Sequence, residues 1–137
     1  MNAPLPPISS GEKILGVGVD LVDIVRIQRA AERHGEAFLQ RVFTPAERAY
    51  CEKLGAPWAS LAARWAAKEA VSKAFGTGIG PELSLNSVSV ENDARGAPSI
   101  VLDAQGEKLL RARGGKRIHI SLTHTATLAQ AFAVITG

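Results

Sequence analysis

Hydrophobic and polar positions alternate in several short stretches of the chain. The first stretch, Ile14–Leu21, has apolar side chains at every second position, with glycine or aspartate between them. This is the pattern of a β-strand with one apolar face. Two pairs of similar stretches predict hairpins, namely Ser87–Glu91 with Ser99–Leu102 and residues 118–123 with Ala129–Ile135.

Helical signals lie between these strands. Asp23 is placed to cap a helix that ends at Gly35, and a second helix begins at Thr44-Pro45-Ala46-Glu47, which is a capping box, and closes at Gly55. The longest helix, Trp58–Phe75, is rich in alanine, lacks internal glycine and proline, and ends at Gly76. A short helix over Ala104–Arg113 follows. Helices clustered between strands predict an α+β fold.

Composition limits the class of protein. The chain has 137 residues, of which 46% are hydrophobic and 21% charged, so we expect one folded domain over residues 12–137 after a flexible, proline-rich arm over residues 1–11. The single cysteine, Cys51, excludes a disulfide scaffold and a cysteine-based zinc cluster. No apolar run reaches the roughly 20 residues of a membrane span, and the first ten residues do not resemble a signal peptide. We therefore expect a soluble, cytoplasmic protein that does not contact the membrane.

The charge balance indicates an acidic partner. Sixteen basic residues stand against 13 acidic ones, and Arg26, Arg29 and Arg33 recur at helical spacing. A nucleic-acid-binding module is therefore one alternative, and a solvated helix face is another. Aromatic residues make up only 5% of the chain, which is sparse for a protein that stacks on bases. The stripe fits an acidic protein or a phosphorylated small molecule as well.

Three residues could form a phosphate and metal site. Glu69 and Lys73 lie one turn apart on the longest helix, either as an exposed ion pair or as a ligand of a hard metal ion beside a phosphate-binding lysine. A metal would need a second carboxylate. Asp20 is a candidate, because the glycines before it leave its face of the strand open to a helix or a ligand; it could equally be a strand-end aspartate that begins a turn.

Two further segments could contact an anion. His124 ends a predicted strand among polar neighbours, where it is either structural or free to donate to an anion. Thr77 lies in a glycine-punctuated segment that follows a helix instead of a strand, the wrong context for a phosphate loop, although its exposed amides could still touch phosphate. Cys51 and His119 fit packing and sheet roles better than chemistry.

These pieces occur together in a known family. Gly18-Val19-Asp20, the run from Trp65 to Lys73, and Ser121–Thr125 resemble, in this order, the phosphopantetheinyl transferases. The resemblance extends from about Ile14 to Ile135 and is to the short, single-domain branch, the holo-acyl-carrier-protein synthases. It rests on four segments, which read GVGVDLVDIVRI, FTPAE, RWAAKEAVSKAFGTGIG and SLTHT. Trp65 stands where this branch often has phenylalanine.

The resemblance implies a fold and a reaction. The fold would be a small antiparallel sheet packed with a long central helix and shorter helices. The reaction would move 4′-phosphopantetheine from coenzyme A, as co-substrate, to a serine of apo-acyl carrier protein in fatty acid biosynthesis. Asp20 and Glu69 would be the ligands of Mg²⁺, with Lys73 on the pyrophosphate. Either a metal-bound water or one of the two carboxylates would accept the serine proton. The expected coenzyme A ligands are Arg64, Lys68, Lys73, Thr77 and His124.

The resemblance also implies partners. The family's small members are homotrimers with active sites shared between subunits, so we expect the same here. Acyl carrier proteins of this class are acidic, and we expect Arg26, Arg29 and Arg33 to dock one of their helices, with Phe38 as an apolar contact beside them. No nucleic acid partner is expected.

Overall fold

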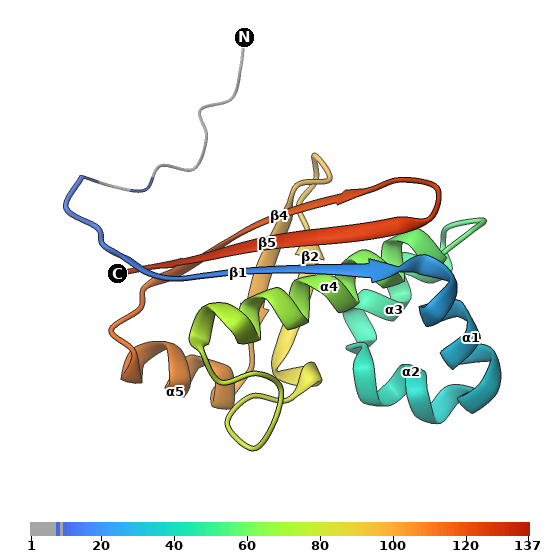
Figure 1. The fold of residues 1–137 in the computed structure, drawn as a ribbon, viewed down its shortest axis with the longest axis horizontal. Helices are drawn as coiled ribbons and strands as arrows, with labels where there is room; N and C mark the ends of the chain where they lie inside the picture. The colour runs from blue at the N-terminus through green and yellow to red at the C-terminus, as the bar shows by residue number, and fades with distance from the viewer. Residues whose placement is uncertain (1–7, 9) are drawn as a thin grey trace, which may run out of the picture.

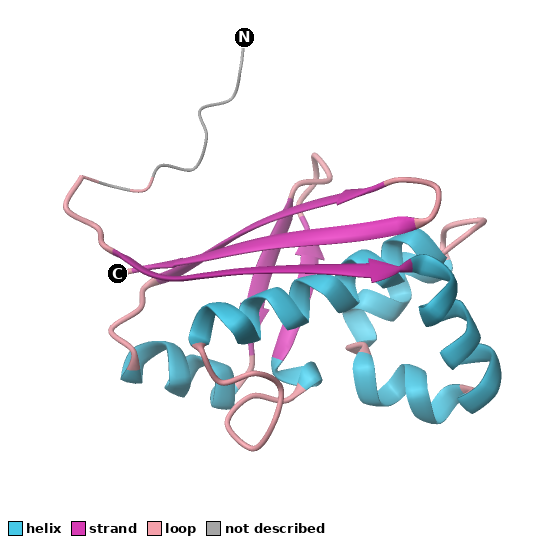
Figure 2. Cartoon of the chain, in the orientation of Figure 1, coloured by secondary structure: helices cyan, strands magenta, loops and turns pink. Residues whose placement is uncertain are grey.

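A three-stranded antiparallel sheet lies across one long helix (Figure 1). The structure is a computed structural model that describes residue 8 and residues 10–137, so most of the predicted arm over residues 1–11 lies outside the described residues. The sheet has the strand order β1-β5-β4, and a separate antiparallel hairpin, β2-β3, crosses behind it in this view. The fold is of the α+β class, as predicted, with helices on one side of the sheet (Figure 2).

The elements follow one another in a mixed order. They are β1 (Ile14–Asp23), α1 (Ile24–His34), α2 (Glu36–Val42), α3 (Pro45–Glu52), α4 (Trp58–Phe75), the 3₁₀ turn η1 (Leu85–Ser87), β2 (Val88–Asn92), β3 (Pro98–Leu102), α5 (Ala104–Ala112), β4 (Arg117–His124) and β5 (Leu128–Thr136).

The longest helix, α4, forms the centre of the core. It packs against β1 and β5, and its buried face is made largely of alanine, including Ala62, Ala66 and Ala70. Small side chains let the sheet approach the helix backbone closely. A Cβ built on Gly16 or Gly18 would lie 1.9 Å from a carbonyl oxygen of α4, so only glycine fits at these two positions of β1. The open strand face noted in the sequence is therefore occupied by a helix.

Local signals placed most element ends. Thr44 and Glu47 form the complete capping box at the start of α3, and Gly76 ends α4 in the left-handed conformation, with φ of 79°. Asp23 occupies the N-cap position of α1, but its side chain makes no capping hydrogen bond to the described residues, so that part of the prediction is wrong. The α3 helix ends at Glu52 instead of reaching Gly55.

The pattern of hydrophobic and polar residues does not predict α2. This seven-residue helix follows α1 directly after Gly35, whose φ is 62°, and buries Phe38 and Val42. A stretch of two turns is too short to establish a helical period. Phe38 packs edge-on against Phe43 and stacks on Trp65, so α2 is held by tertiary contacts with α4.

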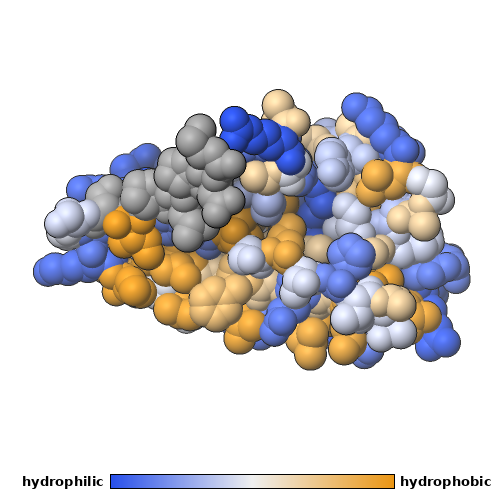
Figure 3. All heavy atoms as spheres, turned by 90° about the horizontal axis from the view of Figure 1, so that it is seen from above, coloured by the Kyte–Doolittle hydropathy of each residue, from blue (hydrophilic) through white to orange (hydrophobic). Residues whose placement is uncertain are grey.

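The outer face of the sheet carries exposed apolar side chains. Val17, Val19 and Leu21 of β1 point away from α4, and Phe132 of β5 lies opposite Val19 in the register. Figure 3 looks onto this face and shows hydrophobic side chains gathered on it. Because exposed apolar patches of this kind mark interaction surfaces, the outer face is a candidate interface. Within the described residues, no helix is long and apolar enough to cross a bilayer.

Candidate active site

Asp20, Glu69 and Lys73 converge where β1 crosses α4. Asp20 follows Gly18 on the face of β1 that packs on α4, and the Lys73 ammonium donates to its Oδ1 at 3.0 Å. The same ammonium donates to the main-chain oxygen of Val19 at 3.0 Å. Asp20 and Lys73, 53 positions apart in the chain, thus form one polar group on the surface of the β1–α4 contact.

Glu69 lies within electrostatic range of both partners. Its own burial raises the pKa of the Glu69 carboxyl; the charge of Asp20 raises it further, and the charge of Lys73 opposes them. Two carboxylates that repel one another beside an ammonium are a set of groups that could hold a cation between the carboxylates and an anion at the lysine. Asp20 and Glu69 therefore lie close enough to interact electrostatically, and their joint role as metal ligands stays a prediction.

The donor set fits a magnesium ion that is shared with a phosphorylated substrate. In the described part of the chain, no group of three His, Cys, Asp or Glu side chains is arranged to hold a metal. Mg²⁺ is typically bound by one or two carboxylates, with waters and substrate phosphates completing its octahedral shell. Asp20 and Glu69 would supply those two carboxylates, and Lys73 would offset the charge of the phosphates.

A second polar group lies around an open cavity of about 370 Å³. His124 at the end of β4 lines it, together with Tyr50 and Asn92. Arg64 is buried, with 3% of its surface exposed, and donates to Ser60 Oγ at 2.6 Å and to Asn92 Oδ1 behind the cavity wall. Its guanidinium also lies 4.6 Å from the centre of the Tyr50 ring.

This arrangement supports part of the coenzyme A prediction. His124 lines the cavity, and Arg64 bonds to Ser60 and Asn92, which also line it. Neither Asp20 nor Glu69 is part of the lining. The Nε atom of Arg64 is buried without a hydrogen-bond partner among the described residues, so the guanidinium keeps unused donor capacity. His124 is exposed, and its Nδ1 lies 3.2 Å from the carbonyl oxygen of Thr125. Both side chains remain predicted coenzyme A ligands.

Lys68 is the main correction among the predicted ligands. Its side chain has no exposed surface, and its ammonium donates to Glu47 Oε1 at 2.6 Å, to Leu85 O at 3.0 Å and to Val88 O. An ammonium has three donors, and here the protein takes all three. Burial lowers the pKa of Lys68, while the charge of Glu47 opposes this. The prediction that Lys68 binds coenzyme A is wrong in this structure, because the side chain points into the core.

Thr77 lies just beyond the end of α4. Its main-chain N–H donates to Ser72 O at 3.2 Å and its hydroxyl donates to Gly78 O at 2.8 Å. The helix end therefore uses this amide, which removes the reason for expecting it to touch phosphate. A role for Thr77 in cofactor binding stays a prediction. Cys51 is buried and burial raises the pKa of its thiol, which fits the packing role expected for it.

The arginine stripe lies on α1, which begins four residues after Asp20. Arg26, Arg29 and Arg33 are exposed, while Ile24 and Ile27 are buried, so the predicted division of this helix into a basic and an apolar face is correct. Phe38 is 7% exposed and packed among aromatic rings. The proposed apolar contact between Phe38 and a partner is therefore wrong.

Several polar residues near the predicted site residues were not predicted from the sequence. Glu47 was recognised only as a helix cap, yet its carboxylate also binds Lys68 and the main-chain N–H of Val90. Tyr50, Ser60 and Asn92 line the cavity near Arg64 and His124. Nothing in their spacing along the chain marks them, because they come from a helix, another helix and a hairpin that only folding brings together.

Comparisons with known proteins agree on one family. Residues 16–133 match the family model described as the 4′-phosphopantetheinyl transferase superfamily. A protein of Methylobacterium sp. strain 4-46 named holo-[acyl-carrier-protein] synthase is 47% identical over 126 residues, covering 89% of this chain and 93% of the relative. One of the same name from Chlamydia trachomatis serovar L2 is 43% identical over 121 residues, covering 88% of this chain and 98% of the relative.

Solved structures give the same result. The crystal structure of holo-[acyl-carrier-protein] synthase from Neisseria meningitidis matches with a TM-score of 0.84 and 36% identity, over 90% of this chain and 98% of that one. The Helicobacter pylori enzyme in complex with coenzyme A matches with a TM-score of 0.78 and 32% identity, over 87% of this chain and 98% of that one. These relatives give no support to the nucleic-acid-binding alternative.

Proposed function

Because the chain belongs to the 4′-phosphopantetheinyl transferase superfamily, we propose that it acts as a holo-[acyl-carrier-protein] synthase whose reaction site is built on Asp20, Glu69 and Lys73. The enzyme transfers 4′-phosphopantetheine from coenzyme A to apo-acyl carrier protein. The convergence of two carboxylates and one ammonium at the β1–α4 contact carries the proposal, since that set suits a pyrophosphate and its cation.

The reaction is a displacement at phosphorus. The serine oxygen of the carrier protein attacks the β-phosphorus of coenzyme A while its proton passes to Asp20, to Glu69 or to a water molecule. The bond from that phosphorus to the bridging oxygen breaks, and adenosine 3′,5′-bisphosphate leaves. Lys73 would bind the pyrophosphate and offset the charge that builds on the leaving oxygen. Asp20 and Glu69 would hold Mg²⁺. When bound there, the ion supplies neutralisation of phosphate charge and in-line alignment of the reacting groups.

The cavity beside His124 is the proposed place for another part of coenzyme A. Arg64 bonds to two of its lining residues, Ser60 and Asn92, and His124 is itself a lining residue. Both side chains can donate to phosphate oxygens when protonated. The related Helicobacter pylori enzyme was crystallised in complex with coenzyme A. Because the cavity and the carboxylates do not share lining residues within one chain, a full site could combine residues from neighbouring subunits.

The outer sheet face supports the proposal of a homotrimer. Val17, Val19 and Leu21 form an exposed apolar row on β1, and Phe132 continues it on β5. Burying such a row against a second copy of the chain would remove apolar surface from water. This row ends near Asp20, so an interface there would place a neighbouring subunit close to the reaction site.

The exposed arginines of α1 support docking of an acidic carrier protein. Their helix begins directly after the strand that carries Asp20, so a carrier protein bound to Arg26 and Arg29 would lie close to the carboxylates. We also propose that the reaction serves fatty acid biosynthesis and takes place in the cytoplasm, where apo-acyl carrier protein would be the substrate.

Mass spectrometry of the carrier protein tests the proposed function. Apo-acyl carrier protein incubated with coenzyme A, Mg²⁺ and this chain should gain the mass of one phosphopantetheinyl group. The gain should disappear when Mg²⁺ is removed by a chelator and when Glu69→Gln replaces the wild type. An unmodified carrier protein under all conditions would contradict the transferase activity. Full modification by Glu69→Gln across a Mg²⁺ titration would contradict the metal assignment alone.

A further inference from the structure

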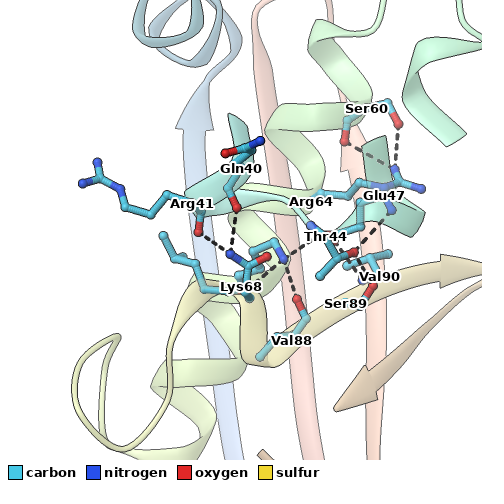
Figure 4. A network of polar contacts seen from close by, with 12 residues as sticks. Gln40, Arg41, Thr44, Glu47, Ser60, Arg64, Lys68, Val88, Ser89 and Val90 are labelled. Atoms are coloured by element: carbon cyan, nitrogen blue, oxygen red, sulfur yellow. Dashed lines mark hydrogen bonds and ion pairs between the residues drawn. The ribbon is translucent and has the colours of Figure 1, made fainter. Parts of the chain in front are cut away.

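Glu47 and Lys68 form an ion pair in the interior of the molecule that the reaction does not use. Neither side chain has exposed surface, and Lys68 Nζ lies 2.6 Å from Glu47 Oε1. The pair joins α3 to the middle of α4. Figure 4 shows the two residues at the centre of a network that also reaches the end of α2 and the start of β2.

The hydrogen-bonding capacity of the pair is used by other segments. The Glu47 carboxylate accepts the main-chain N–H of Thr44 at 2.9 Å and that of Val90 at 2.9 Å, besides the lysine. The Lys68 ammonium donates to the carbonyl oxygens of Leu85 and Val88 as well. One carboxylate and one ammonium therefore fix the N-terminus of α3, the turn η1 and the strand β2 relative to α4.

Lys68 directly precedes Glu69 on α4. Consecutive residues of an α-helix are about 100° apart around the axis and rise about 1.5 Å, so a fixed direction for Lys68 determines the direction of Glu69. On another side of the same helix, the glycines of β1 contact the carbonyl oxygens of Ala70 and Ala74. The rotation of α4 is thus set from two sides, one by the sheet that carries Asp20 and one by the buried ion pair.

A buried ion pair is a poor device for stability alone. Its desolvation offsets much of the attraction between the charges, and apolar pairs of similar volume often serve as well. Such a pair can instead fix the orientation of its side chains, because each of its hydrogen bonds requires a particular geometry. Lys68 of the pair comes one residue before Glu69, whose carboxyl interacts electrostatically with that of Asp20. A small rotation of α4 would therefore change the separation of the two carboxylates.

We propose that Glu47 and Lys68 are positioning residues that set the rotation of α4 and so hold Glu69 at the distance from Asp20 that cation binding requires. This inference rests on the proposed function, and it assigns to two core residues the role of positioning a side chain of the proposed site. It replaces the direct role in coenzyme A binding that the sequence suggested for Lys68. The pair contacts no substrate in this role and acts only through Glu69.

The test compares variants on the two sides of the pair with a matched control. Glu47→Gln keeps the shape and one acceptor, and Lys68→Arg keeps the charge but replaces a three-donor ammonium with a planar guanidinium. Glu36→Gln is the control. Glu36 also bonds a basic side chain at 2.7 Å, but it is exposed and its partner is Arg48 of α3. Each variant is examined as the full chain, with Mn²⁺ as the probe, by electron paramagnetic resonance in the presence of coenzyme A.

We expect Glu47→Gln and Lys68→Arg to weaken Mn²⁺ binding and lower kcat by about 10–100-fold, the usual effect of losing a residue that orients a metal ligand. KM for coenzyme A should change less than about threefold, and circular dichroism should show a folded protein at the assay temperature. Glu36→Gln should behave as the wild type. In the double variant Glu47→Gln/Lys68→Arg, the loss should not exceed that of the worse single variant, because the pair acts as a unit.

Two results would overturn the inference. One is wild-type Mn²⁺ affinity and kcat per folded molecule in Glu47→Gln. The other is an equal loss of Mn²⁺ and coenzyme A affinity in proportion to unfolded protein, which indicates a structural role only. If Lys68→Arg does not fold, Glu47→Gln decides between these results. Failure of the proposed function gives a different pattern, since the wild type itself would then leave the carrier protein unmodified. Failure of the metal assignment alone would let Glu69→Gln keep both Mn²⁺ binding and turnover.

Discussion

Glu69 illustrates at the residue scale how a carboxylate that is unfavourable in the free protein can suit the proposed reaction. Burial and the charge of Asp20 both disfavour its ionised form, and Lys73 only partly compensates. A bound cation would relieve this repulsion. The local electrostatics therefore favour binding of a cation over the empty state.

The raised pKa of Glu69 predicts how pH acts on this site. The carboxylate takes up a proton at a higher pH than an ordinary glutamate, so Mn²⁺ affinity should fall on acidification with a midpoint above that of a free glutamate. The ionised group also costs stability at neutral pH, and this cost should vanish as the pH falls below both the folded and the unfolded pKa. Glu69→Gln should accordingly raise the Tm by a few degrees at pH 7 and not at low pH. Equal Tm values at every pH would contradict this interpretation.

Lys73 provides a second prediction at this scale. Its ammonium bonds Asp20 and the main chain of Val19 from a half-exposed position, so Lys73→Ala should cost less than about 1 kcal/mol of stability. Turnover should fall by about 100-fold or more, since a charge that stabilises the transition state is lost. Lys73→Arg should remain impaired because the planar guanidinium is larger. Steady-state kinetics with a thermal melt of each variant checks this. A variant that only melts earlier would show that Lys73 serves as a salt bridge alone.

At the scale of elements, the contact between β1 and α4 decides where the proposed catalytic residues lie. Gly18 allows the strand to pass against the carbonyl oxygen of Ala70, and Asp20 follows two positions later on the same face. The strand and the helix thus bring their functional groups together by close backbone approach, without a loop. Any residue larger than glycine would push Asp20 away from Glu69.

Gly18→Ala should therefore impair both folding and turnover. The added Cβ would lie 1.9 Å from Ala70 O and 2.8 Å from Ala74 N, which are backbone atoms that cannot move aside cheaply. We expect a loss of about 1–3 kcal/mol or more in the free energy of unfolding, measured by denaturant titration. Gly55→Ala is the matched control, because no described atom lies within 4 Å of its added Cβ, and it should be neutral or slightly stabilising. Equal stability of the two variants would refute the close-approach argument.

The exposed arginines of α1 allow a separate prediction about the affinity for the carrier protein. Arg26→Glu should raise KM for the carrier protein by about fivefold, equivalent to roughly 1 kcal/mol, and weaken the salt dependence of the rate. KM for coenzyme A should stay nearly unchanged. Arg111→Glu, an exposed arginine on α5, is the control and should leave both KM values in place. If Arg26→Glu instead changes KM for coenzyme A alone, the stripe belongs to the cofactor site.

At the scale of the whole molecule, the sheet has one face in the core and one open face rich in apolar side chains. The inner face carries Ala129, Ala131 and Ala133 against α4, whereas Phe132 lies between them on the outer side. A large aromatic ring on the outer face of a small sheet suits an interface between copies of the chain better than contact with water.

Phe132→Asp should therefore break the proposed trimer. Light scattering coupled to size exclusion should report a trimer for the wild type and a smaller species for the variant, with turnover reduced as well if neighbouring subunits share the site. Val101→Asp is the matched control. Val101 and Phe132 are each 45% exposed, but Val101 lies on β3, outside the three-stranded sheet. A wild type that is monomeric, or a Phe132→Asp variant that stays trimeric, would contradict the proposed interface.

Local signals in the sequence were enough to determine most elements and the residue types of the site. The capping box at Thr44, the left-handed Gly76 and the alternation in β1 each act within a few residues, so they can be read without the fold. The same signals placed Asp20 on a strand and Glu69 and Lys73 on one side of a helix, although β1 runs past Asp20 to Asp23 and so Asp20 does not end it. The resemblance of four ordered segments then indicated the family.

Tertiary structure alone decided which charged and aromatic residues lie inside. Lys68 and Glu69 are neighbours in the sequence, yet the lysine is enclosed by α3, η1 and β2 while the glutamate faces Asp20. Phe38 is covered by Trp65 of α4, so it does not contact a partner, and α2 forms around that contact. Burial of a side chain depends on segments far away in the chain, whose approach no local pattern records. The sequence by itself therefore identified the candidate reactive groups, and only packing separated the exposed candidates from those that are buried in the core.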